Sequence, residues 1–187
     1  NTKTKAGFLV RIWLLGIFLA ALLAGGFFVF VRPAAAATEV SGSLLLDQTW
    51  TKAQSPYVVK FDVWTSGVRV EAGATLTIEP GVVVKFDRGT TLSSAAGGKI
   101  IAVGTSAERI VFTALTDDTV AGDTNGDGTA TQPEVAFWLG VRLRNSADRL
   151  EFTELRYGDF CIDSDQVLII KNNKFLDCGA GINIRSG

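Results

Sequence analysis

The sequence predicts an all-β protein built as a parallel β-helix, preceded by an N-terminal helix of the signal or transmembrane type. Three observations lead to this fold class: short apolar alternations after residue 57, no sustained helical period after residue 38, and an imperfect repeat of 20–24 residues. Alternation of apolar and polar residues with a period of two is typical of half-buried strands. Repetition at this length is typical of a solenoid, in which each repeat adds one coil.

The repeat shows in the spacing of apolar residues, and a coil of 20–24 residues holds three short strands. Each coil then forms one rung, about 4.8 Å thick, and stacks its apolar residues on those of the coil below. We assign residues 38–56 to a linker or N-terminal cap and residues 57–187 to the coils. Residues at the repeat spacing are Val68 and Leu92, Leu76 and Ile100, Leu150 and Ile170, Leu155 and Phe175, and the series Val141, Ile162 and Ile182.

The first 37 residues indicate export. Three basic residues precede an uncharged, almost wholly apolar stretch at residues 12–31, and a run of alanines follows. That order is typical of a secretory signal peptide, with cleavage between Ala37 and Thr38. The apolar stretch is also long enough to span a bilayer, so an uncleaved anchor, with residues 12–31 as the membrane contact, is the alternative. Because the basic residues come first, both alternatives place the remaining chain outside the cytoplasm.

Composition argues against several classes of function. All 19 acidic residues but only 14 of the 18 basic ones lie in residues 38–187, which gives that part a net charge of −5. An acidic balance argues against a nucleic-acid partner, because phosphate binding needs clustered Lys and Arg. The chain has no His, which removes the commonest general base and zinc ligand. No nucleophile elbow, phosphate loop or CxxC pair is present, so we assign no catalytic residues.

One segment carries a resemblance to known proteins. It reads GATLTIEPGVVVKF over residues 73–86 and GGKIIAVGTSAERIVFTA over residues 97–114. This combination resembles the opening coils of bacterial right-handed parallel β-helix repeat proteins of pectin-lyase-like architecture. The resemblance covers about residues 57–187 and implies a right-handed solenoid with a capped first coil. It departs from the pattern at residues 138–140, which read W-L-G where such proteins tend to read W-G-G.

An acidic insertion at residues 115–137 interrupts the strands. Residues 123–134 fit the calcium-loop pattern D-x-[DN]-x-[DN]-G-x5-E in every fixed position. Calcium takes six to eight hard oxygen ligands, and alternate side chains of a tight loop can supply them. We therefore expect a structural calcium site, and a solvated acidic turn is the alternative. The expected ligands are the side chains of Asp123, Asn125, Asp127 and Glu134 and the backbone carbonyl of Thr129.

The insertion departs from an EF-hand in its surroundings. Pro133 comes just before Glu134, and no amphipathic helix flanks the loop on either side. The pattern therefore indicates an isolated calcium loop, not a helix–loop–helix sensor. Asp117 and Asp118 are candidates for outer ligands.

Cysteines and tryptophans complete the candidate residues. Cys161 and Cys178 are the only cysteines, and an extracytoplasmic location permits a disulfide between them. Two buried free thiols are the alternative. Trp50, Trp64 and Trp138 could stack on sugars, but we expect them to fill the coil ends or cover the core.

We therefore expect a secreted or cell-surface solenoid that is stabilised by calcium and has a structural, adhesive or glycan-binding role. Its partners would be polysaccharides or other surface proteins. The alternative is a polysaccharide lyase or glycoside hydrolase whose catalytic coils lie beyond Gly187, because the repeat is still running there and the chain also starts without Met. The carboxylate pairs Glu151 with Glu154 and Asp163 with Asp165 are interpreted as the solvated outside of rungs.

Overall fold

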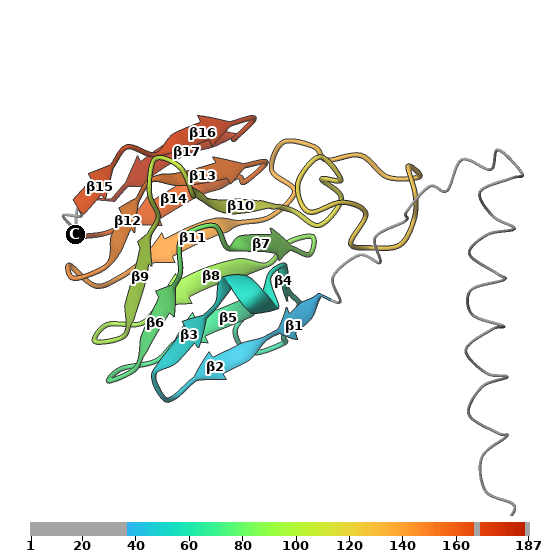
Figure 1. The fold of residues 1–187 in the computed structure, drawn as a ribbon. Coiled ribbons are helices and arrows are strands. Elements are labelled where there is room, and N and C mark those ends of the chain that lie inside the picture. The colour runs from blue at the N-terminus through green and yellow to red at the C-terminus, as the bar shows by residue number, and fades with distance from the viewer. Residues whose placement is uncertain (1–36, 167–168, 186–187) are drawn as a thin grey trace, which may run out of the picture. The chain divides into compact units, whose positions relative to one another are not determined.

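The fold is a three-sided parallel β-solenoid (Figure 1). The computed structural model describes residues 37–166 and 169–185. The chain visits the three sheets in a fixed order, so three consecutive strands complete one coil and every pairing is parallel. Two sheets contain six strands and the third contains five, which corresponds to about six turns. The predicted all-β solenoid is confirmed.

Each sheet takes one strand from every coil it crosses, and neighbouring strands belong to neighbouring coils. Sheet A contains β1 (Thr38–Val40), β4 (Tyr57–Val59), β7 (Val83–Phe86), β10 (Ile110–Ala114), β13 (Thr153–Arg156) and β16 (Lys174–Leu176). Sheet B contains β2 (Gly42–Leu44), β5 (Gly67–Val70), β8 (Thr91–Ser94), β11 (Gly140–Leu143), β14 (Phe160–Ser164) and β17 (Ala180–Ile184). Sheet C contains β3 (Gln48–Trp50), β6 (Thr75–Ile78), β9 (Lys99–Val103), β12 (Arg149–Glu151) and β15 (Ile169–Lys171). One 3-10 turn, η1 (Lys52–Gln54), lies between β3 and β4.

The register of the strands confirms the repeat inferred from spacing. Residues that stand one repeat apart in the sequence are partners in adjacent strands of one sheet. Their apolar side chains therefore stack on one another from coil to coil. The paired residues are Val68 with Leu92, Leu76 with Ile100, Val141 with Ile162, Ile162 with Ile182, Leu150 with Ile170, and Leu155 with Phe175.

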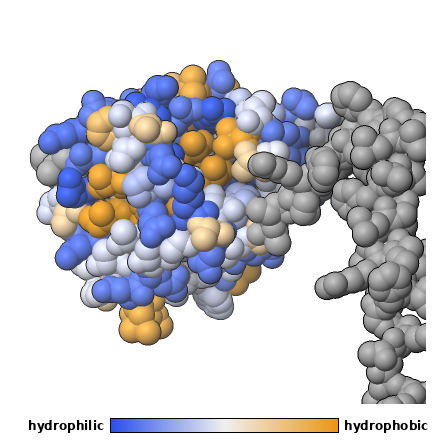
Figure 2. All heavy atoms as spheres, viewed as in Figure 1, coloured by the Kyte–Doolittle hydropathy of each residue, from blue (hydrophilic) through white to orange (hydrophobic). Residues whose placement is uncertain are grey.

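The core is a column of apolar side chains enclosed by the three sheets. Aromatic rings stack within it: the ring centroids of Phe86 and Trp138 are 3.9 Å apart. At the first coils, Trp50 stacks on Tyr57 at 4.8 Å. Trp50 and Trp138 are thus buried, as expected, whereas Trp64 is 89% exposed. On the face shown in Figure 2, apolar side chains form separate patches among polar ones.

The first coil begins at Thr38, although the sequence suggested a linker or cap over residues 38–56. Strands β1, β2 and β3 pair with β4, β5 and β6 of the next coil. Each of the three strands has three residues, and only Leu44 and Trp50 in them are buried apolar side chains. Strands this short leave no detectable alternation, which is why the sequence did not indicate a coil at this point.

The apolar export segment lies outside the described residues, which include only Ala37 and Thr38 of the predicted cleavage site. The backbone N–H of Thr38 donates to the Pro56 carbonyl at 2.9 Å, so the first strand is hydrogen-bonded from that residue onward. In the part of the chain that is described, no helix has the length and apolar character needed to cross a membrane.

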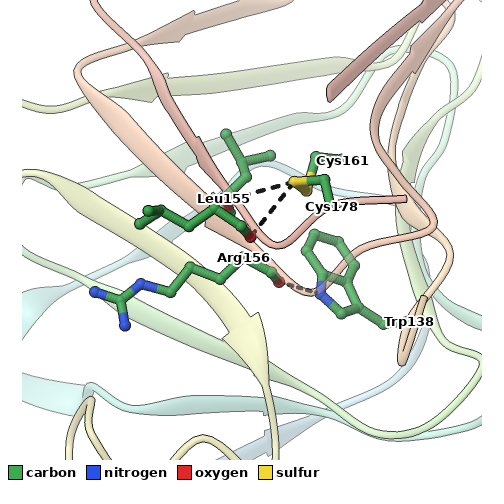
Figure 3. Close-up of a disulfide and its surroundings, with 6 residues drawn as sticks. Trp138, Leu155, Arg156, Cys161 and Cys178 are labelled. Carbon is green, nitrogen blue, oxygen red and sulfur yellow. Dashed lines mark hydrogen bonds between the residues drawn. A yellow bond between two sulfur atoms is a disulfide. The ribbon is translucent and has the colours of Figure 1, made fainter. Parts of the chain in front are cut away.

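A disulfide joins the fifth coil to the sixth (Figure 3). Cys161 lies in β14, and Cys178 lies at the corner between β16 and β17, with the two Cα atoms 5.8 Å apart. Cys161 is completely buried. Trp138 lies beside this bond in the same view, and its Nε1 donates to the Arg156 carbonyl at 2.7 Å. The disulfide thus adjoins the aromatic part of the core.

Candidate metal centre in the acidic insertion

The acidic insertion leaves the solenoid at the corner between β10 and β11 and forms the yellow to orange loops of Figure 1. It returns onto the outer face of sheet A. Lys85 of β7 is fully buried there, and its Nζ donates to the Gly122 carbonyl at 2.7 Å. Thr113 of β10 donates its hydroxyl to Asp117 at 2.6 Å. The insertion is therefore attached to the rungs of the third and fourth coils.

Asp117 is the anchor of this attachment. Its carboxylate is completely buried and accepts hydrogen bonds from the hydroxyl groups of Thr113 at 2.6 Å and Thr119 at 2.5 Å. Arg156 of β13 adds an ion pair at 3.4 Å. With its oxygens engaged by side chains of two strands and of the loop, Asp117 positions the insertion and is unlike a free metal ligand.

Asp123 organises the turn that follows. Its two carboxylate oxygens accept backbone N–H groups from Gly126 at 2.8 Å, Gly128 at 2.9 Å and Asp127 at 3.2 Å. The N–H of Gly128 is the largest cause of a lowered pKa at Asp123. Gly126 and Gly128 have φ values of 74° and 71°, a region that favours glycine. The turn thus holds Asp123 in its ionised form with its oxygens directed inward.

Three carboxylates converge inside this turn. Asp118, Asp123 and Asp127 each offer an oxygen that lies within 4.8 Å of the others. Because calcium binds oxygen at 2.3–2.6 Å, two ligands of one ion are at most about 5 Å apart, so the spacing suits one ion. Oδ2 of Asp127 accepts from Asn125 Nδ2 at 2.7 Å and from Thr131 Oγ1 at 2.5 Å. These bonds direct the Asp127 carboxylate toward the other two.

Two oxygens of this group have no hydrogen-bond partner among the described residues. They are Oδ1 of Asp118 and Oδ1 of Asp127, and both are buried from solvent. Buried carboxylate oxygens without a partner are rare because losing water without a new bond is unfavourable. The arrangement supplies lone pairs that a cation could use.

The charges around the group are unbalanced. Burial is the largest cause of a raised pKa at Asp118, and the negative charge of Asp123 adds to it. Burial lowers the pKa of Lys85, while the charges of Asp118, Asp117 and Asp123 oppose that change. One buried ammonium group therefore faces several carboxylates, and a bound cation would relieve the remaining repulsion.

The structure brings only part of the sequence-predicted ligand set together. Asp123, Asn125 and Asp127 form the turn, but the Glu134 carboxylate pairs with the Arg88 guanidinium at 2.5 Å. In an EF-hand, position twelve belongs to a helix that follows the loop. In this chain residues 131–134 have no regular structure, so no helix returns Glu134 to the site.

Asp118 is the residue that the sequence motif does not include. It precedes the motif by five positions and enters the site because Asp117 fixes the preceding backbone against sheet A. The only sequence signal for it is the pair of aspartates directly after a strand.

The carboxylates considered for glycosidase chemistry all lie in ion pairs with arginines, and Glu154 and Asp163 are buried, not solvated as the sequence suggested. Glu154 accepts from Arg156 Nε at 2.7 Å. Asp163, which is 1% exposed, accepts from Arg144 at 2.7 Å, Asn183 at 2.9 Å and Arg185 at 3.1 Å. These residues span the fourth to sixth coils, so Asp163 holds successive rungs together.

Asp163→Asn should lower stability by about 1–3 kcal/mol at pH 7, because hydrogen bonds to a buried charge are lost. Burial disfavours ionisation of Asp163, but the bonds and charge of Arg144, with Asn183 and Arg185, outweigh it and lower the pKa. A lowered folded-state pKa adds stability above the unfolded value of about 3.9, and this is lost as the pH falls below it. Urea unfolding at pH 7 and pH 3 should therefore show a smaller acid-induced loss in the variant.

The matched control for this prediction is Asp165→Asn, since that neighbouring side chain is 39% exposed and pairs only loosely with Arg144 at 3.7 Å. It should leave stability at pH 7 within about 0.5 kcal/mol of the unsubstituted chain. Equal acid sensitivity in the Asp163 variant and the unsubstituted chain would contradict the assigned role of Asp163.

Comparison with known proteins gives a limited similarity. A stretch of 76 residues, 40% of this chain, is 38% identical to Protein bark beetle of Drosophila melanogaster. The match spans 2% of the length of that protein. No protein-family model matches the chain, and no solved structure matches it.

Proposed function

We propose that this chain is an exported, secreted or cell-surface β-solenoid of the right-handed, pectin-lyase-like type found in bacterial repeat proteins. A structural calcium ion would stabilise its acidic insertion, and its sheet faces would serve an adhesive or glycan-binding role. The observation that carries the calcium part is the convergence of three carboxylates, two of which have a buried oxygen without a hydrogen-bond partner among the described residues.

The ion would be held by Asp118, Asp123 and Asp127, with Asn125 and the Thr129 carbonyl as further oxygen donors from the sequence motif. Hard oxygen donors of this kind suit calcium better than a transition metal. When bound, the ion supplies positive charge that offsets the repulsion among the carboxylates. The insertion is attached to sheet A through Asp117 and Lys85, so ordering the loop also stabilises the rungs beneath it.

Two further features support export. The first strand begins at Thr38, directly after the predicted cleavage position. The disulfide between Cys161 and Cys178 is of a kind that persists in oxidising compartments outside the cytoplasm. A lyase or hydrolase whose catalytic coils lie beyond Gly187 is the second candidate, because within residues 38–187 Glu154 and Asp163 are held in ion pairs with arginines.

Calcium should bind the full chain saturably and raise its melting temperature. With a dissociation constant of roughly 10⁻⁴ M, 10 mM calcium would add about 2.7 kcal/mol and raise the Tm by about 5–10 °C. The measurement is a calcium titration by calorimetry on the full chain in detergent micelles, with thermal melting in calcium and in chelator.

Matched variants separate the two possible ligand sets. Asp118→Asn and Asp127→Asn should each abolish the calcium-dependent rise in Tm, whereas Glu134→Gln should retain it because Glu134 pairs with Arg88 outside the site. Loss of the rise in the Glu134 and Asp127 variants, with the rise retained in Asp118→Asn, would return the site to the ligand set of the sequence motif. No heat and no change in Tm at 10 mM calcium would overturn the calcium site.

A further inference from the structure

A groove of about 570 Å³ crosses the outer face of sheet B. It runs over strands β5, β8 and β11, and residues of four successive coils line it. The lining residues that matter for its chemistry are Trp64, Arg69, Ser93, Arg142, Arg144 and Asp165. The acidic insertion is attached to sheet A, so the groove on sheet B is a separate feature.

Trp64 is displayed at this groove by a well-ordered turn. Its side chain is 89% exposed. Oδ1 of Asp62 accepts the backbone N–H of Trp64 at 3.0 Å, and the N–H and hydroxyl of Thr65 both at 2.9 Å. The Thr65 hydroxyl oxygen also lies 2.7 Å from the Gly67 carbonyl oxygen, so its one proton is shared between these two acceptors. An exposed indole on a fixed turn is a flat, amphipathic surface on which a ligand can stack without ordering the backbone first.

Two arginines lie in one ladder along the floor of the groove. Arg69 is the neighbour of Ser93, and Ser93 is the neighbour of Arg142, so the two arginines are two rungs and roughly 10 Å apart. Arg69 forms an ion pair with Glu71, in which the Arg69 Nε and Glu71 Oε1 atoms are 3.4 Å apart. Arg142 forms no hydrogen bond or ion pair with any residue that the structure describes, although it is half-buried.

Arg144, the third arginine of the groove, already forms hydrogen bonds within the protein. Its guanidinium donates to the carboxylate of Asp163 at 2.7 Å and to the Asp163 carbonyl at 2.9 Å. Arg142 is therefore the half-buried guanidinium with donors available to a ligand. A planar guanidinium binds carboxylate and sulfate groups through two parallel hydrogen bonds.

We propose that the groove binds an anionic sugar chain, with a sugar ring stacked on Trp64 and an acidic substituent held by Arg142 and Arg69. This inference rests on the glycan-binding part of the proposed function and deepens it. The apolar face of a pyranose ring suits an indole surface, and the hydroxyl groups of Ser93 and its neighbours suit sugar hydroxyls. The acidic group is a carboxylate or a sulfate, since both match a guanidinium.

The test uses three soluble probes of equal length: an oligogalacturonate, a heparin-derived sulfated oligosaccharide and a neutral cello-oligosaccharide. Each is titrated into the full chain in detergent micelles by calorimetry and tryptophan fluorescence. We expect at least one acidic probe to bind at least ten-fold more tightly than the neutral one. The better of the two acidic probes identifies the substituent as a carboxylate or a sulfate.

Variants assign the binding to this groove. Trp64→Ala and Arg142→Ala should each weaken binding of the acidic probe at least ten-fold, and Arg142→Lys should recover part of the loss because it keeps the charge but not the planar fork. The first control is Val63→Ala, because Val63 is next to Trp64 and 74% exposed but does not line the groove. The second is Arg149→Ala, which removes an arginine from sheet C. Both controls should bind as the unsubstituted chain does.

Single-stranded DNA is titrated as a further comparison. Three results would overturn the inference: no acidic probe bound at millimolar concentration, neutral and acidic probes bound equally, or DNA bound more tightly than both acidic oligosaccharides. The calcium-dependent rise in Tm is measured on the same samples. A rise without binding of any acidic probe rejects the groove and retains the calcium site, whereas binding without a rise rejects the calcium site and retains the groove.

Discussion

Gly140→Ala should destabilise the solenoid by at least about 4 kcal/mol, an effect reserved for severe backbone conflict. Gly140 begins β11 with a φ of 104°, which L-residues rarely adopt. A Cβ atom there would lie closer than 3.0 Å to the Phe160 carbonyl oxygen and 2.8 Å from its carbon. Both are backbone atoms of the next coil, so no side chain can move aside. The substitution therefore forces the fourth and fifth coils apart.

Equilibrium urea unfolding followed by circular dichroism measures this effect. Gly73→Ala is the matched control, because Gly73 has a similar φ of 87° but open space around the added Cβ. The control retains the backbone strain alone, which amounts to about 1–2 kcal/mol. If both variants lost the same free energy of unfolding, the closeness of the Phe160 backbone would not be the reason that position 140 needs glycine.

Trp138→Ala should cost about 3–5 kcal/mol, the usual range for deleting a large buried aromatic side chain. The indole is completely buried, stacks on Phe86 and donates its N–H to the Arg156 carbonyl. Its removal leaves a cavity beside Phe86 and deprives the Arg156 carbonyl of this hydrogen bond. Trp138→Phe should recover most of the stacking but not the hydrogen bond.

The same unfolding measurement on Trp64→Ala provides the control, since that indole is 89% exposed. The control should lie within about 0.5 kcal/mol of the unsubstituted chain. A loss in Trp64→Ala as large as that in Trp138→Ala would contradict the assignment of one tryptophan to the core and the other to the surface.

The sequence predicted the register of the later coils because the inward apolar residues recur there at nearly constant spacing. Val68 with Leu92 and Val141 with Ile162 stand one repeat apart in the sequence and are strand partners in the fold. The first coil escaped detection because its three-residue strands show too little alternation. Burial of Trp50 and Trp138 was also expected, but nothing local distinguishes them from the exposed Trp64.

Only part of the candidate metal centre could be predicted from a short sequence motif. The turn around Asp123 and Asp127 depends on hydrogen bonds within a few residues, and a short motif describes such bonds well. Asp118 and Lys85 join it only because the insertion returns to sheet A, a contact between residues distant in the chain. Glu134 satisfies the motif but pairs with Arg88 instead.

The disulfide has a mechanical consequence for a molecule built as a stack. Each coil of a solenoid is bonded only to its neighbours. When the two ends are pulled apart, we therefore expect the coils to unfold one after another from an end. Cys161 and Cys178 are 17 residues apart, so this bond withholds roughly 50 Å of chain from extension while it is intact. Extension of the fifth and sixth coils would then depend on the surrounding redox potential as well as on the force.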